Sequence, residues 1–464
     1  MTGAAEYLPA SFRDRAGRLF SRDGRLYRQV NRAGAEDFAA FVDSGLYRDL
    51  LDARAIIPHQ SVDIGLAIEP DIAVEVLEPQ LVPYLSWPYE WCFRQLQDAA
   101  LLTLDIQLMA LQRGMILKDA SAYNIQFVDG RPLLIDTLSF ATYRDGQPWY
   151  AYRQFCQHFL APLALMSWVD PRLAKLLRDH IDGIPLDLAV KLLPRKAFFR
   201  YGLFAHLYLH ARSQQQHSDD ARGGAVKRAS RISQTALSAM ISGLRRTVAR
   251  MSPPAVATEW QGYYEETNYS EQAMAEKIEV IERIFTGLGR QGMVIDLGAN
   301  TGRFSRLAAS YADVVIAQDI DHNAIDELYG QLKSGEPAAI LPLVQDLANP
   351  SPGLGWAQSE REGLLQRGEV DVLLALALIH HLAIGNNLPL DSIMRFFAAL
   401  ARHVIVEFVP RGDSQVDRML ATREDIFDDY SAEHFEAAAA PLFEVEAKQP
   451  LAGSERVIYH LRRK

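Results

Sequence analysis

The sequence has little cysteine, no long hydrophobic run and no excess of positive charge. Its 464 residues include only Cys92 and Cys156, so it has neither a disulfide framework nor a CxxC metal or redox motif. No stretch approaches the roughly 20 apolar residues of a membrane-spanning helix, and the N-terminus carries acids and arginines where a secretory signal is apolar. The 58 acidic residues outnumber the 48 basic ones, giving a net charge of −10 that disfavours nucleic acid as a partner. These absences predict a soluble, cytoplasmic protein.

The length of the chain and the pattern of its polar and apolar residues predict two domains and a linker. The 464 residues, 49% of them hydrophobic, are enough for two or three domains. We expect a first domain at 1–212, a polar and then basic linker at 213–258, and a second domain at 259–464. The linker has no acidic residue from 221 to 254, and its apolar residues between 237 and 251 recur at helical spacing. Such a helix fits a connector packed on a neighbouring domain, or a peripheral contact with an anionic membrane.

A strand, a glycine turn and a helix follow one another after residue 292. The segment reads VIDLGANTGRFSRL, with Asp296 at the end of the strand and Gly298, Asn300 and Gly302 in the turn. Glycines let a backbone approach a ligand closely, and the first N–H groups of a helix have no partner within the helix. A dinucleotide site has the spacing GxGxxG and binds an anionic pyrophosphate, whereas Asp296 favours a cationic ligand.

Two further acids follow the next predicted strands. We predict strands at 314–317 and 340–344, which lead to Asp319 and Asp346, and a fourth at 370–375, which runs into LALIHHL. Ligands of an open doubly wound sheet bind beyond the carboxyl ends of its strands, where an acid can bind both hydroxyls of a ribose. Three acids at successive strand ends therefore predict a cofactor site, although each acid alone also fits a strand-end cap.

This pattern resembles motif I of the class I S-adenosylmethionine-dependent methyltransferases, usually DxGxGxG and here DLGANTG. The resemblance covers about residues 259–464 and implies an α/β, Rossmann-like domain with a seven-stranded sheet, whose last hairpin pairs FEVEAKQ with ERVIYHLR. It also implies the contacts of S-adenosyl-L-methionine: Asp296, Gly298, Asn300 and Gly302 at the methionine end, Asp319 at the ribose, and Asp346 at the adenine amino group.

Methyl transfer to oxygen needs a base near the acceptor. His380 and His381 after the fourth strand, and Glu407 at the end of the fifth, are the catalytic candidates. The histidine pair also fits simple packing, and two histidines with a glutamate fit a metal site that lacks a clear fourth ligand. The surrounding phrases LALALIHHLAIGNN, VEFVPRGD and REDIFDDY resemble a narrower bacterial group of nodulation-type methyltransferases.

A second group of polar residues lies in the first domain. We predict a helix at about 90–112, followed by Asp119, by Asn124 five residues later, and by a DG hairpin that leads to Asp136. This arrangement resembles the protein-kinase-like phosphotransferases, in particular the aminoglycoside and small-molecule branch. The resemblance implies an α+β kinase-like domain in which Asp119 orients the substrate hydroxyl, while Asn124 and Asp136 hold Mg²⁺ on ATP.

The first domain also departs from that pattern. Lys118 and the residue before it replace the first two loop residues, Thr137 follows Asp136 where an aromatic is usual, and no glycine-rich phosphate loop is visible. No lysine precedes Lys118, so Arg28 or Arg32 is the available substitute for the lysine that normally neutralises the phosphates. The triad equally fits turn residues that cap loops in a degenerate domain, which binds or presents the acceptor.

The leading interpretation is a two-domain enzyme that transfers a methyl group from S-adenosylmethionine to a hydroxyl or amine of a small-molecule or saccharide acceptor. One alternative is a bifunctional kinase-methyltransferase that acts on a glycan or glycolipid. Another is a pseudokinase-methyltransferase with a binding or regulatory role. A third is an RNA methyltransferase that binds RNA through the arginines of the linker.

Overall fold

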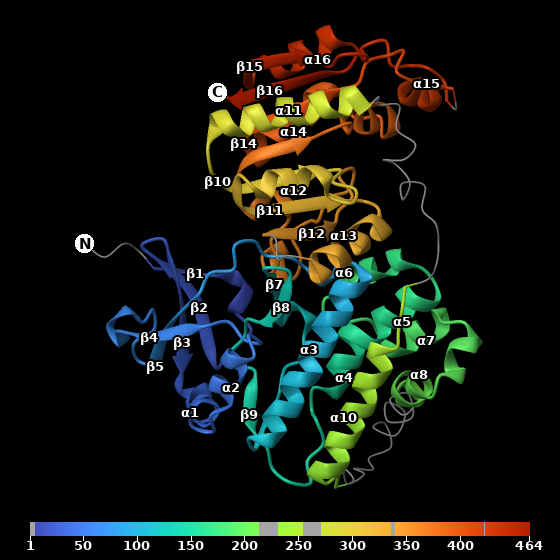
Figure 1. Cartoon of the computed structure of the whole chain (residues 1–464). Helices are drawn as coiled ribbons and strands as arrows, with labels where there is room; N and C mark the ends of the chain where they lie inside the picture. Colours follow the sequence, from blue (N-terminus) through green and yellow to red (C-terminus); the bar gives the residue numbers. More distant parts are fainter. Residues whose placement is uncertain (1–4, 213–230, 254–270, 336–338, 422) are drawn as a thin grey trace. The chain divides into compact units, whose positions relative to one another are not determined.

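The computed structural model describes residues 5–212, 231–253, 271–335, 339–421 and 423–464, and divides into two compact units (Figure 1). The first unit comprises residues 1–255 together with residues 353–361. The second comprises residues 256–352 and 362–464. Within the described ranges, none of the helices has the length and apolar character needed to cross a membrane.

The N-terminal part of the first unit is a five-stranded antiparallel sheet. Its strands lie in the order β1 (Glu6–Tyr7), β2 (Gly17–Arg22), β3 (Arg25–Asn31), β5 (Ala73–Pro79) and β4 (His59–Val62). Helices α1 (Ala35–Asp43) and α2 (Leu46–Asp52) connect β3 to β4. The tight β2–β3 hairpin forms because Asp23 and Gly24 both have positive φ values, 52° and 75°, as its two-residue turn requires. Phe20, Tyr27 and Val76 form the core on this sheet.

The remainder of the first unit is mostly helical. The helix predicted at 90–112 is present as α3 (Phe93–Gln112). The other helices are α4 (Tyr152–Phe155), α5 (Ala161–Trp168), α6 (Leu176–Asp179), α7 (Leu186–Leu192), α8 (Tyr201–Leu203) and α10 (Gln234–Ala249). This part also contains two short two-stranded sheets. In one, β6 (Met115–Leu117) pairs with β9 (Phe140–Thr142), and in the other, β7 (Ile125–Val128) pairs with β8 (Arg131–Leu134). The predicted DG hairpin joins β7 to β8, so Asp136 follows directly after β8.

Helix α10 belongs to the first unit, whereas the sequence predicts it inside a separate linker. It packs along α3 (Figure 1), and four residues of its apolar stripe are completely buried: Leu237, Ile241, Leu244 and Val248. Gln97 of α3 donates hydrogen bonds to the carbonyl oxygens of Val248 and Met251, and Arg245 pairs with Asp105. The helix is therefore a packed connector, whose apolar stripe is not available to a membrane. Linker residues 213–230 and 254–258 lie outside the described residues.

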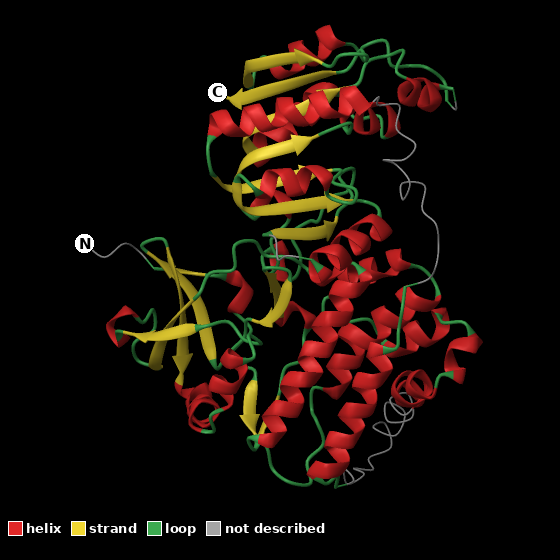
Figure 2. Ribbon diagram, in the orientation of Figure 1, coloured by secondary structure: helices red, strands yellow, loops and turns green. Residues whose placement is uncertain are grey.

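The second unit is built around the seven-stranded sheet that the methyltransferase resemblance implies (Figure 2). The strand order is β12 (Ile340–Val344), β11 (Ala312–Asp319), β10 (Gln291–Leu297), β13 (Val370–Ala375), β14 (Ala401–Phe408), β16 (Val457–Arg463) and β15 (Phe443–Pro450). The first five strands are parallel, and β16 is antiparallel to both of its neighbours. Strands β11 and β13 flank β10, so the strand order reverses at the carboxyl ends of β10 and β13, which is where ligands bind in such sheets.

Both faces of this sheet are covered, which explains its nearly continuous apolar strands. Val294 and Val372 share a core with Ile281 of α11, and the next residues along, Ile295 and Leu373, point to the opposite face and are also buried. The helices are α11 (Glu271–Leu288), α12 (Arg303–Ala309), α13 (His322–Ser334), α14 (Leu390–Leu400), α15 (Ser414–Leu420) and α16 (Ala432–Ala439).

Candidate active site

A cavity of about 300 Å³ opens at the carboxyl ends of β10, β11, β12 and β13. Asp296 is the penultimate residue of β10, Asp319 ends β11, Asp346 follows β12, and His381 follows β13. All four side chains line the cavity. The structure thus brings the three predicted acids together, as expected for strands that run parallel and end at one edge.

The glycine turn between β10 and α12 has a left-handed backbone at three positions. The φ values are 76° at Gly298, 51° at Asn300 and 80° at Gly302. Gly298 and Asn300 line the cavity. Gly302 is not among the described residues that line it. A Cβ at that position would lie 2.6 Å from Leu328 Cδ1. Glycine is therefore needed at position 302 for two reasons: the backbone has a positive φ, and α12 packs closely against α13.

The carboxylate of Asp296 is buried, with 2% of the residue exposed. The hydroxyl of Ser305 donates a hydrogen bond to Asp296 Oδ2 at 2.6 Å. Burial raises the pKa of Asp296 to about 6, although Ser305 and Lys277 favour the charged form. Asp296 is therefore mostly ionised at neutral pH, and a cation in the cavity would stabilise its charge further.

Asp319 is held by the backbone of two loops. Its Oδ2 accepts a hydrogen bond from the N–H of Asn300 at 2.8 Å, and its Oδ1 accepts one from the N–H of Asp321 at 2.9 Å. Desolvation raises the pKa of Asp319 to about 6, and these backbone donors limit the rise. Each carboxylate oxygen has a second acceptor site, so the side chain can still bind hydroxyl groups.

Asp346 caps a turn at the end of a strand and also lines the cavity, so it has both features that the sequence left open. Its Oδ1 accepts a hydrogen bond from the N–H of Ala348 at 3.0 Å, which caps the turn after β12. The same side chain lines the cavity. A cap and a ligand contact are therefore compatible at this position.

The two histidines after β13 have different surroundings. His381 lines the cavity, and burial together with Arg456 lowers its pKa to about 4, so the ring is neutral at pH 7. His380 is completely buried, and within the described part of the chain both of its ring nitrogens are without a hydrogen-bond partner. The two ring centroids lie 4.1 Å apart. Position therefore makes His381 the candidate base and His380 a packing residue.

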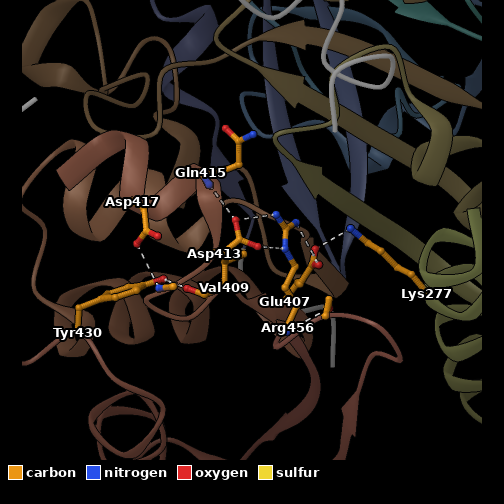
Figure 3. A network of polar contacts seen from close by, with 10 residues as sticks. Lys277, Glu407, Val409, Asp413, Gln415, Asp417, Tyr430 and Arg456 are labelled. Atoms are coloured by element: carbon orange, nitrogen blue, oxygen red, sulfur yellow. Dashed lines mark hydrogen bonds and ion pairs between the residues drawn. The ribbon is translucent and has the colours of Figure 1, made fainter. Parts of the chain in front are cut away.

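Glu407 belongs to a buried ionic network and not to the cavity wall (Figure 3). Its Oε2 lies 2.6 Å from Lys277 Nζ, and its Oε1 lies 3.6 Å from an Arg456 nitrogen. Arg456 also binds both carboxylate oxygens of Asp413, at 2.7 and 3.1 Å. Glu407 is thus bound to two buried cations and does not line the cavity, where a catalytic base would lie.

Sequence reasoning missed Lys277, which lines the cavity. Its Nζ lies 4.8 Å from the centre of the Phe304 ring, and desolvation lowers its pKa while Glu407 opposes that shift. One signal was available, since Met274, Lys277 and Ile281 are spaced along one face of α11 and the two apolar ones pack in the core. A lysine on an apolar helical face requires a buried partner.

The described residues contain no cluster of three or more His, Cys, Asp or Glu side chains that could hold a metal ion. The alternative metal site at His380, His381 and Glu407 therefore does not form. Glu407 is committed to Lys277 and Arg456, and His380 is buried away from the cavity.

A second cavity, of about 620 Å³, lies in the first unit and contains the predicted triad. Asp119, Asn124 and Asp136 all line it, together with Arg28 of β3. Arg28 forms an ion pair with Asp136, whereas Arg32 is exposed after the end of β3. Of the two arginines considered in place of a lysine, Arg28 lines this cavity and Arg32 does not.

The acids of this triad differ in their charge environment. Burial raises the pKa of Asp136, but Arg28 and the hydroxyl of Ser139 outweigh it and hold the pKa below its ordinary value. Burial and the nearby charge of Asp136 raise the pKa of Asp119. Gln154 donates a hydrogen bond to Asp119 Oδ1 at 2.8 Å. The pKa values of the two carboxyl groups are thus shifted in opposite directions, as often occurs at functional sites.

Two residues of the segment 353–361 contribute to the wall of this second cavity, which sequence analysis did not predict. They belong to the first unit although they lie between β12 and β13 in the chain. Arg13 Nη2 lies 2.7 Å from the buried carboxylate of Glu360. The guanidinium of Arg361 lies 4.7 Å from the centre of the Tyr123 ring. Glu360 and Arg361 both line the cavity.

The sheet order, the glycine turn and the three acids define the second unit as a methyltransferase-type α/β domain. The chain is 37% identical to the nodulation protein NoeA of Rhizobium meliloti (strain 1021) over 469 residues, which cover 98% of this chain and 95% of that protein. The chain therefore belongs to the NoeA family. No protein-family model matches it.

Solved structures match parts of the chain more weakly. Magnesium protoporphyrin IX methyltransferase (ChlM) from Synechocystis PCC 6803 with bound SAH is 16% identical, with 44% of this chain and 93% of that chain covered and a TM-score of 0.32. The N-methyltransferase NodS from Bradyrhizobium japonicum WM9 is 12% identical, with coverages of 42% and 98% and a TM-score of 0.30. WbdD is 16% identical, with 40% of each chain covered and a TM-score of 0.29.

Proposed function

We propose that this protein is an S-adenosylmethionine-dependent methyltransferase that acts on a hydroxyl or amine of a small-molecule or saccharide acceptor. One observation carries the proposal: Asp296, Asp319 and Asp346 line a single cavity beside the glycine turn. Three carboxylates in one cavity suit a ligand that presents positive charge and several hydrogen-bond donors. S-adenosylmethionine has both, and when bound it supplies a methyl group on a positively charged sulfur.

The residues of the cavity fit such a ligand. Asp296 would accept hydrogen bonds from an ammonium group at the methionine end, next to Gly298 and Asn300. Asp319 would bind the ribose hydroxyls through the acceptor sites that its two backbone donors leave open. Asp346 would accept a hydrogen bond from the adenine amino group. The main contribution of the protein is then to align the reacting groups and place charge around them.

We assign His381 as the base that receives the proton of the acceptor. Its neutral ring lines the cavity and can accept a hydrogen bond from the acceptor hydroxyl or amine. The ring would take the acceptor proton as the acceptor atom bonds to the methyl carbon and the methyl–sulfur bond breaks, and it would then release this proton to water. The low pKa of His381 favours release of that proton after each turnover.

Calorimetric titration of the full-length chain with S-adenosylmethionine tests the proposal. We expect one binding site, with affinity at least tenfold lower in Asp296→Asn, because the substitution removes charge with little change in shape. Release of S-adenosylhomocysteine in the presence of glycan and metabolite pools then reports turnover. A wild-type chain that binds no S-adenosylmethionine would contradict the proposal.

The second cavity supports a second candidate function, binding of a magnesium-nucleotide for phosphotransfer to the same acceptor. The supporting observation is that Asp119, Asn124, Asp136 and Arg28 line one cavity. Titration with ATP and Mg²⁺, alongside Asp136→Ala, tests it. Binding that the variant loses would support a bifunctional kinase-methyltransferase. No binding by the wild type would leave a pseudokinase module with a binding or regulatory role.

A further inference from the structure

The described parts of two chain segments without acidic residues pack together in the first unit. Neither residues 188–218 nor residues 221–258 contain Asp or Glu, although the whole chain has a net charge of −10. Their described parts include α8 and α10. Gly202 of α8 lies so close to α10 that a Cβ there would be 2.1 Å from Thr247 Oγ1. The close approach brings Arg200 of the first segment to the same cavity as Arg246 and Arg250 of the second.

A cavity of about 500 Å³ opens where these segments meet, and it is lined by arginines. Arg200 contributes from the first segment, and Arg246 and Arg250 contribute from the second. All three are exposed, and none forms an ion pair with any residue that the structure describes. The hydroxyl groups of Ser167 and Thr247 also line the cavity. Guanidinium groups of this kind bind phosphate oxygens in a bidentate manner.

Two aromatic side chains protrude next to these arginines. Phe199 is 91% exposed and Tyr201 is 83% exposed, and they lie on either side of Arg200 in the chain. Aliphatic side chains of the same segment are exposed as well, with Leu192 at 42% and Leu209 at 46%. Exposed apolar surface beside a basic cavity is typical of an interaction site. We call Phe199, Arg200, Tyr201, Arg246 and Arg250 the basic aromatic surface.

We propose that the basic aromatic surface binds an anionic phospholipid bilayer. The arginines bind the headgroup phosphates, while Phe199 and Tyr201 enter the interfacial layer, where aromatic rings are stabilised. A nucleic acid is the competing polyanion, and it would stack its bases on the aromatic rings. The exposed leucines favour the bilayer, because aliphatic side chains do not stack on bases but do partition into lipid. The contact therefore uses residues 199–201 at the start of α8, with Arg246 and Arg250 at the end of α10, and not the buried stripe of α10.

Co-sedimentation of the full-length chain with vesicles tests this proposal. One set of vesicles contains phosphatidylcholine alone, and the other contains phosphatidylcholine mixed with anionic phosphatidylglycerol. We expect binding to the anionic vesicles only, and binding that weakens as salt is added. The double variant Arg246→Ala/Arg250→Ala should bind about 30-fold more weakly, which corresponds to about 1 kcal/mol for each basic residue near an anionic surface.

Matched variants separate the apolar contribution from the charge. Phe199→Ser/Tyr201→Ser should weaken vesicle binding by at least tenfold, whereas Tyr150→Ser, at another exposed aromatic of the first unit, should leave it unchanged. Thermal unfolding checks that each exposed substitution leaves the fold intact. The proposal would be overturned if the wild-type protein did not bind anionic vesicles, or if the variants bound them as well as the wild type does. Salt-sensitive binding to polyuridylic acid in place of vesicles would also overturn it.

Discussion

Lys277 Nζ and Glu407 Oε2 lie 2.6 Å apart, with 3% and 0% of the two side chains exposed. The pair joins α11 to the end of β14, across 130 residues of sequence. Arg456 and Asp413 extend it to a network of two positive and two negative charges. Because burial makes a single charge costly, each member of the network requires the others.

The first prediction is that Glu407→Gln strongly destabilises the protein. The substitution keeps the size of the side chain but removes the negative charge that faces Lys277 and Arg456. We expect the free energy of unfolding to fall by about 3–5 kcal/mol, measured by urea denaturation. Asp313→Asn is the control, since Asp313 and Arg290 form an exposed pair that contributes at most about 1 kcal/mol. Equal losses in the two variants would show that the buried network is not stabilising.

The second prediction distinguishes the two neighbouring histidines. His381→Ala should reduce turnover by about 10²–10⁴-fold, the usual contribution of a general base, while cofactor affinity stays near normal. His380→Ala should mainly lower thermal stability, because the ring is completely buried and does not line the cavity. Turnover with saturating S-adenosylmethionine is the measurement. Unchanged turnover in His381→Ala would remove this residue as the base.

The third prediction concerns pH. The pKa values of Asp296 and Asp319 are both raised to about 6, so each carboxyl becomes neutral as the pH falls from 7 to 5. Protonation removes the negative charge that attracts a cationic ligand, and affinity for S-adenosylmethionine should therefore decrease as the pH falls through about 6. In Asp296→Asn, calorimetry should find weaker binding with a shallower pH dependence. An affinity that rises on acidification would contradict the assignment of these acids.

The fourth prediction tests which arginine supports the second cavity. Arg28→Ala removes the partner of Asp136 and leaves a mostly buried carboxylate without its cation. We expect a loss of about 1–3 kcal/mol in the free energy of unfolding. Arg32→Ala lies at an exposed position and should change stability by less than about 0.5 kcal/mol. Chemical denaturation of both variants provides the measurement, and similar values would rule out a stabilising pair at Arg28.

The elements of the second unit could be predicted because their signals are local. The apolar runs that end at Asp296, Asp319 and Asp346 have the length of strands, and parallel strands bring their ends to one edge. The requirement for glycine at position 302 was also predictable, but its reason was not. Whether a small residue faces a ligand or Leu328 depends on the packing of α13 against α12.

Pairings between distant residues could not be predicted. Nothing in the sequence around Lys277 indicates that its partner is Glu407, and Glu407 read alone fits a catalytic base equally well. The contact of Glu360 with Arg13 could not be predicted either, because residues 353–361 have no periodic pattern that places them in the first unit. Such contacts are set by the tertiary fold and not by local propensity.

Residues 353–361 make the first unit discontinuous in sequence. The polypeptide crosses between the units three times, so no single cut separates them into complete parts. A gene fragment that ended after α10 would encode the first unit without Glu360 and Arg361, and Arg13 would lose its partner. The two units therefore cannot be expressed as separate continuous chains without loss of the Arg13–Glu360 pair.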